Sequence, residues 1–131
     1  LDPILWNAET GKRVQTFVGK QSKIRSFDAS TDGNTLAIGS DNYALLWDLK
    51  VGKPVQLWDK QPDLVNSVSL SADARKMAST GWKGDTTLWD TSTGKKLGDF
   101  LGTTDYAQPV KSQLSPDGKT FLTTNSKGKV T

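Results

Sequence analysis

One short motif recurs at nearly constant intervals along the chain. Leu-Trp followed by Asn or Asp occurs at Leu5-Trp6-Asn7, Leu46-Trp47-Asp48 and Leu88-Trp89-Asp90. The three tryptophans are 41 and 42 residues apart. Self-similarity at a period of about 20–50 residues is typical of repeat architectures, in which each unit is one supersecondary module. The spacing therefore predicts a row of stacked modules rather than one core built from unrelated elements.

Three further features repeat in phase with the tryptophans. A turn ending in Gly-Lys follows each motif, at Gly11-Lys12, Gly52-Lys53 and Gly94-Lys95. An aromatic residue stands six positions after each of these glycines, at Phe17, Trp58 and Phe100. A second turn carries an aspartate, at Asp32-Gly33, Asp73-Ala74 and Asp117-Gly118. Between these markers the residues predict short strands. The first full unit illustrates this with Ile24 to Ala29, Thr35 to Gly39, the segment ending at Trp47, and Val55 to Trp58. Four short strands in about 42 residues are the layout of a propeller blade.

These features resemble the WD-repeat (beta-transducin-like) family over essentially the whole chain. Ser115-Pro116-Asp117-Gly118 and the run from Leu88 to Gly94 match the family's turn and strand signatures. The resemblance implies an all-β fold, a WD-repeat β-propeller of four-stranded antiparallel blades whose first strands lie nearest the central axis. We expect the end of one blade at residues 1–18, a second blade at 19–59, a third at 60–101 and the start of a fourth at 102–131.

The chain departs from the family pattern at its buried polar residues. Many WD repeats carry a histidine that joins a hydrogen-bond network with an Asp, a Ser or Thr, and the Trp, but this sequence contains no histidine. The matching aspartate is present as Asp41, whereas Lys83 and Lys127 stand at that position in the later units. We therefore expect degenerate blades, held together mostly by apolar packing.

About three blades form an incomplete ring. Propellers typically have about four to eight blades, and a shorter arc leaves the flat faces of its terminal sheets open to association. Two alternatives follow: the chain is a segment of a larger propeller, or copies of it assemble into a ring.

Composition excludes several classes of chemistry. Without histidine there is no Ser-His-Asp triad, and without cysteine as well there is no ordinary zinc or haem site. We predict no catalytic, cofactor or metal site. Lysines are scattered singly or in pairs, and the net charge is only +3, so we do not expect a nucleic-acid partner. No apolar run approaches the roughly 20 residues that span a bilayer. The first residues, from Leu1 to Ile4, lack both an initiator methionine and the layout of a signal peptide.

The repeated residues are predicted to be structural. We expect the aromatic series to pack between neighbouring sheets, and Asp48 and Asp90 to accept hydrogen bonds from the turns that follow them. The packing series consists of Trp6, Trp47, Trp89, Phe17, Trp58 and Phe100.

Trp82 belongs to no repeat series, which makes it the leading candidate for partner contact. In the resembled family its loop lies on the rim that most often binds partners, and tryptophan is enriched at interface hot spots. A simpler interpretation is that Trp82 folds over its own blade and shields the sheet. The candidate partner-binding rim comprises Trp82, Tyr43, Asp41, Asp63, Asp105 and Tyr106.

The resemblance implies a protein–protein interaction scaffold that presents loops on one rim of the propeller. An alternative is a non-catalytic segment of a propeller enzyme, a hydrolase or a quinone-dependent oxidoreductase, whose active-site groups lie outside this chain. A third alternative is a purely structural repeat in a larger protein. Fold does not decide among these functions.

Overall fold

The computed structural model describes residues 3–16, 23–59, 61, 64–102 and 109–125. All regular elements within these ranges are β-strands. The fold is thus all-β. No helix in these ranges combines the length and apolar character needed to cross a membrane.

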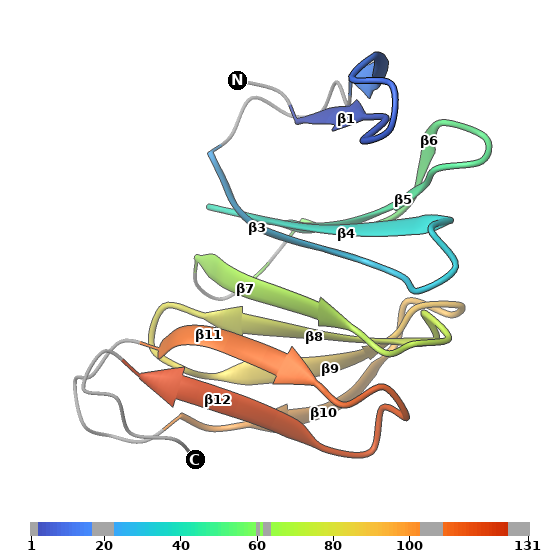
Figure 1. Cartoon of the computed structure of the whole chain (residues 1–131). Coiled ribbons are helices and arrows are strands. Elements are labelled where there is room, and N and C mark those ends of the chain that lie inside the picture. Colours follow the sequence, from blue (N-terminus) through green and yellow to red (C-terminus); the bar gives the residue numbers. More distant parts are fainter. Residues whose placement is uncertain (1–2, 17–22, 60, 62–63, 103–108, 126–131) are drawn as a thin grey trace.

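The strands form antiparallel sheets in which chain neighbours pair with each other. Two sheets have four strands each and are flanked by two sheets of two strands. The first small sheet pairs β1 (Ile4–Trp6) with β2 (Arg13–Thr16). The first large sheet contains β3 (Ile24–Ala29), β4 (Thr35–Ser40), β5 (Ala44–Asp48) and β6 (Lys53–Trp58). The second large sheet contains β7 (Val65–Leu70), β8 (Lys76–Gly81), β9 (Thr86–Asp90) and β10 (Lys96–Phe100). The second small sheet pairs β11 (Pro109–Leu114) with β12 (Phe121–Asn125). Figure 1 shows the sheets stacked in chain order without closing into a ring.

The turn after each first strand repeats atom for atom. Ser30 Oγ donates to Asp32 Oδ1 at 2.6 Å, and the same carboxylate accepts the Asn34 N–H at 2.9 Å. These two bonds lower the pKa of Asp32 below its ordinary value, the hydroxyl bond being the larger cause. The equivalent Ser–Asp pairs are Ser71–Asp73 and Ser115–Asp117. Such local side-chain bonds explain why Ser and Asp favour this turn.

The turn after each third strand is also held by an acidic or amide side chain. Asp48 Oδ1 accepts the N–H groups of Lys50 and Val51 at 2.8 and 3.2 Å. Asp90 and Asn7 hold their own turns in the same way. The glycine that ends each turn has a positive φ between 67° and 72°, a region that favours glycine.

Apolar packing joins consecutive sheets through the repeat tryptophans. Trp47 is only 6% exposed and clusters with Ile38 and Leu45, against which Leu5 of β1 packs. Trp89 occupies the same place one blade later, where it packs against the buried cluster that contains Trp58. Trp47 and Trp89 therefore each fill the space between their own sheet and the preceding one.

Polar side chains also link the first strands of successive sheets, beside the apolar packing that we expected to predominate. Val68 N–H donates to Ser26 Oγ at 3.1 Å, and Leu70 N–H donates to Asp28 Oδ2 at 2.7 Å. One blade later, the same two positions repeat this arrangement with Ser112 N–H bonded to Ser67 Oγ and Leu114 N–H to Ser69 Oγ. These bonds satisfy free-edge N–H groups that would otherwise be costly to bury.

Trp6 does not lie between two sheets as predicted, whereas Phe100 contacts the neighbouring sheet but stays partly exposed. Trp6 is 54% exposed, because no sheet in the described residues lies on its other side. The guanidinium carbon of Arg13 lies 5.7 Å from the centroid of its ring. Phe100 is also exposed, although its ring meets Phe121 edge-on with centroids 4.8 Å apart. Phe17 lies outside the described residues.

Candidate partner-binding rim

A β-bulge at the start of β3 places Arg25 on the rim. The register of β3 with β4 shifts between Ile24 and Ser26, so Arg25 has no partner residue on β4. Bulges turn the extra side chain away from its expected direction. The same shift occurs between Val65 and Ser67 in β7. The fold therefore repeats a bulged position at the rim end of its first strands.

Arg25 joins two blades. Its Nε donates to Asp41 Oδ1 in the β4–β5 loop of its own sheet, in an ion pair that is partly exposed on both sides. Its guanidinium carbon also lies 5.8 Å from the ring centroid of Trp82, which belongs to the β8–β9 loop of the next sheet. A planar guanidinium suits both an ion pair and stacking on an aromatic face. Arg25, Asp41 and Trp82, named here the rim cluster, thus form one surface across two blades.

Loop length explains why Trp82 stands outside the repeat series. Ser40 N–H bonds to Tyr43 O across the β4–β5 loop, and Gly81 N–H bonds to Asp85 O across the β8–β9 loop. The first hydrogen bond encloses a loop of two residues and the second a loop of three, so the loop that contains Trp82 is one residue longer. Gly84 has φ 94°, as expected for a three-residue hairpin whose last residue is left-handed.

Backbone contacts hold the Trp82 loop in position. Trp82 N–H donates to Leu64 O at 3.0 Å, and Asp85 Oδ1 accepts Gly102 N–H at 2.8 Å. A Cβ on Gly102 would stand 2.7 Å from the carbonyl carbon of Gly84, so these two segments touch at their backbones. Trp82 is half-buried, and its ring lies against Arg25 of the neighbouring blade.

The other predicted rim residues have different outcomes. Tyr43 is a correction: it lies on the rim loop, but its side chain is buried with Ile38, Leu45 and Trp47, because position 43 continues the apolar face of β5. Asp63, Asp105 and Tyr106 lie outside the described residues.

Arg25 was missed by the sequence reasoning. The sequence gives little sign of this position, because a bulge only shifts the alternation of apolar and polar residues by one. Asn66 stands 41 residues further on at the equivalent bulge, so the repeat itself could have marked both positions.

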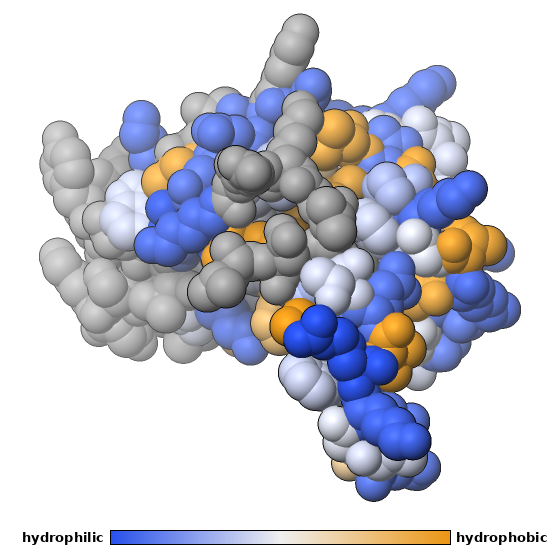
Figure 2. Space-filling view, turned by 90° about the horizontal axis from the view of Figure 1, so that it is seen from above, coloured by the Kyte–Doolittle hydropathy of each residue, from blue (hydrophilic) through white to orange (hydrophobic). Residues whose placement is uncertain are grey.

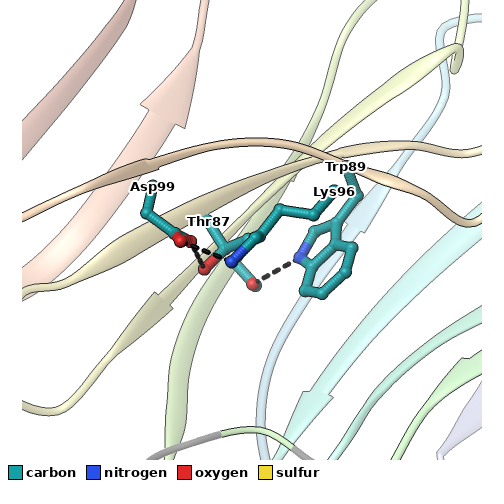
Figure 3. Close-up of polar contacts among 5 residues, drawn as sticks. Thr87, Trp89, Lys96 and Asp99 are labelled. Carbon is teal, nitrogen blue, oxygen red and sulfur yellow. Dashed lines mark hydrogen bonds and ion pairs between the residues drawn. The ribbon is translucent and has the colours of Figure 1, made fainter.

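A second polar cluster lies on the outer strands of the third blade (Figure 3). Asp99 accepts hydrogen bonds from Lys96 Nζ at 2.5 Å and from Thr87 Oγ1 at 2.9 Å, and these bonds lower its pKa, with the Lys96 bond the larger cause. Trp89 Nε1 donates to Ser79 Oγ at 2.8 Å nearby. Lys96 and Asp99 are exposed, which makes this a solvated surface pair. Within the described ranges, no group of three or more His, Cys, Asp or Glu residues is placed to hold a metal ion.

The repeated blades, their turns and their tryptophan joints define a WD-repeat protein of the β-propeller type. Residues 11–48 match the family described as WD domain, G-beta repeat. Curated relatives include subunit I of eukaryotic translation initiation factor 3 from three fungi. The Neosartorya fischeri protein is 32% identical over 102 residues, covering 73% of this chain and 30% of the relative. The Aspergillus fumigatus protein is 33% identical, with coverage of 75% and 25%. The Neurospora crassa protein is 36% identical, with coverage of 56% and 21%. The matches therefore span less than a third of each relative's length.

Proposed function

We propose that this chain is the interaction module of a subunit of eukaryotic translation initiation factor 3 and that it binds another protein of that assembly through the rim cluster. The observation that supports this proposal most strongly is the position of Arg25. Its contacts with Asp41 and Trp82 fix side chains of two blades relative to each other. A surface ordered before binding loses little conformational freedom when a partner arrives.

The same proposal makes the chain a scaffold rather than a catalyst. Its full sequence lacks histidine, the commonest general base, and cysteine, whose thiolate is a strong nucleophile. The turn aspartates already accept hydrogen bonds from their own loops, as Asp32 and Asp48 illustrate. A protein partner suits the rim better than a nucleic acid does, because Arg25 is paired with a carboxylate and is not free to meet phosphate.

Binding measurements with purified components test this function. The chain is titrated by calorimetry with each of the other subunits of the factor from the same organism. We expect one subunit to bind, and we expect Trp82→Ala and Asp41→Ala each to weaken that binding at least about tenfold, as truncation of an interface hot spot does. Val55→Ser changes an exposed residue on the outer strand β6 and serves as the control. Absence of binding to every subunit, or equal loss in the Val55 control, would refute the proposal.

A further inference from the structure

A β-bulge recurs on the outermost strand of three successive sheets. In β6, the register with β5 shifts between Leu46 and Trp47, so Val55 has no partner residue. The equivalent shifts leave Val14 without a partner in β2 and Leu97 without one in β10. A bulge interrupts the exposed edge of a strand and so discourages pairing with a foreign strand.

The extra residue of each bulge is aliphatic and exposed. Val14, Val55 and Leu97 are 58%, 57% and 50% exposed. A single exposed aliphatic side chain needs no explanation, but here one recurs at the same position in three sheets. The absence of a neighbouring sheet does not explain Val55, because its sheet lies between two others in the stack (Figure 1). Protection of the strand edge does not explain it either, since a polar residue in the bulge would serve as well.

Basic residues accompany these three side chains. The six residues that follow the glycine of each Gly-Lys turn contain one bulge, and the three segments together hold five Lys or Arg and one Asp. Their net charge is +4, whereas that of the whole chain is +3. Arg13, Lys53 and Lys96 stand on the bulged strands themselves and are exposed, and the one acidic residue, Asp99, pairs with Lys96. The outer strands therefore carry the excess positive charge of the chain.

Aliphatic and basic side chains thus alternate along the outer strands, with each bulge residue one or two positions from a lysine or arginine. In Figure 2, which views the molecule from the side of β1, hydrophobic side chains lie in small groups among hydrophilic ones. Such a surface complements a segment that carries both acidic and aliphatic side chains, because burial of small apolar contacts is combined with attraction between opposite charges. The outer-strand surface, as named here, comprises Val14, Val55, Leu97, Arg13, Lys53 and Lys96.

Other occupants match this surface less well. A second copy that met it with its own outer strands would set basic residues against basic residues, and like charges repel. A nucleic acid gains little from exposed aliphatic side chains, and only one of the five basic residues is an arginine. Segments that bind membranes bury a continuous apolar face, whereas these aliphatic residues lie on three separate strands.

We infer that the outer-strand surface binds an acidic segment with aliphatic side chains from a protein partner. This site is separate from the rim cluster, which lies on the β4–β5 and β8–β9 loops, and the inference does not rest on the function proposed for the rim. Val55→Ser separates the two sites, because it should weaken binding at the outer strands and leave binding at the rim unchanged.

Fluorescence anisotropy with three short labelled peptides tests the chemistry of the ligand. One peptide alternates Asp and Leu, the second alternates Asp and Ser, and the third alternates Lys and Leu. We expect the Asp-Leu peptide to bind at least about tenfold more tightly than either of the others, since it alone matches both the charge and the aliphatic side chains. Added salt should weaken its binding. No binding of the Asp-Leu peptide, or equal binding of the Asp-Leu and Asp-Ser peptides, would overturn the inference.

Variants of the whole chain locate the site. The double variant Val55→Ser, Leu97→Ser and the charge reversal Lys53→Glu should each weaken binding of the Asp-Leu peptide about tenfold. All three side chains are exposed, so the Tm of each variant should stay close to that of the wild-type chain. Leu122→Ser is the matched control, because Leu122 is a similarly exposed aliphatic residue on β12, and it should bind as the wild-type chain does.

Two further outcomes would contradict this assignment. Loss of peptide binding in Trp82→Ala but not in the double variant would place the peptide on the rim cluster. Cosedimentation with vesicles of phosphatidylserine and phosphatidylcholine tests the membrane as occupant. We expect the wild-type chain to stay in the supernatant, and vesicle binding that the double variant abolishes would replace the protein partner with a lipid surface.

Discussion

Trp58 and Trp89 lie in contact across two blades, with ring centroids 5.4 Å apart and ring planes inclined by 41°. Trp58 Nε1 also donates to the carbonyl of Gly94, in the turn that follows Trp89, at 3.1 Å. Trp58 ends the outermost strand of one sheet, and Trp89 is the repeat tryptophan of the next. The repeat tryptophans and the aromatic residues that follow the Gly-Lys turns are separate series in the sequence, but here one member of each packs against the other between two blades.

Substitution of Trp58 separates the two parts of this joint. Trp58→Ala should lower the free energy of unfolding by about 3–5 kcal/mol, as truncation of a large buried aromatic does. Trp58→Phe keeps a ring against Trp89 but loses the bond to Gly94, and it should cost about 1–2 kcal/mol. Urea unfolding followed by circular dichroism measures both. Equal losses for the two variants would show that the ring contact contributes little.

Ala74 is the one non-glycine residue with positive φ, at 58°, among the described residues. The equivalent turns have Gly33 and Gly118 with φ 72° and 68°. Ala74→Gly should therefore stabilise the fold by about 0.5–1 kcal/mol, since relief of left-handed strain exceeds the added freedom of the unfolded chain. Gly33→Ala, where an added Cβ meets nothing within 4 Å, should destabilise by a similar amount. Thermal unfolding of both variants checks this prediction. A lower Tm for Ala74→Gly, or a higher Tm for Gly33→Ala, would contradict it.

Gly39 is required by close packing rather than by backbone conformation. A Cβ there would stand 2.9 Å from Val65 Cγ1 and 3.2 Å from the Val65 carbonyl oxygen. Gly39→Ala should cost about 1–3 kcal/mol through overpacking. Gly98→Ala is the control, because its Cβ would make only an ordinary contact of 3.6 Å with Phe100. Denaturant midpoints that fall equally in both variants would argue against a tight interface at Gly39.

The repeated turns predict an acid-sensitive fold. Hydroxyl bonds from Ser30, Ser71 and Ser115, followed by backbone N–H bonds, lower the pKa of Asp32, Asp73 and Asp117 in the folded state. A lowered folded pKa contributes stability above the ordinary aspartate pKa of about 3.9, and this contribution is lost as pH falls below that value.

Urea midpoints measured from pH 6 down to pH 2.5 check this prediction. They should stay level above about pH 5 and then fall as the carboxylates protonate. Ser30→Ala removes the largest cause of the Asp32 shift, so its midpoint should be lower at neutral pH but should fall less steeply in acid. A wild-type midpoint that rises in acid would contradict the assignment.

Residues that repeat at one spacing could be predicted from sequence because their physical requirements recur in each blade. The aspartates of the turns are examples, since Asp48 and Asp90 accept bonds from the same relative N–H groups. The same repetition predicts a stack of four-stranded sheets, which the structure contains.

Residues whose neighbours come from another blade could not be predicted in this way. Trp6 shares its motif with Trp47, but exposure depends on whether a sheet lies alongside. Arg25 reaches the rim through a bulge, and its contact with Trp82 joins residues 57 positions apart. Tyr43 was predicted on the rim because of its loop position, but its ring completes a core cluster.

The stacking of sheets through the repeat tryptophans is tested most directly by comparing two of them. Trp47 and Trp6 occupy the same place in the motif but are 6% and 54% exposed. The free energy of unfolding, measured by urea denaturation, should fall by about 3–5 kcal/mol in Trp47→Ala and by no more than about 1 kcal/mol in Trp6→Ala. A loss below about 1 kcal/mol in Trp47→Ala, or equal losses in the two variants, would contradict this architecture.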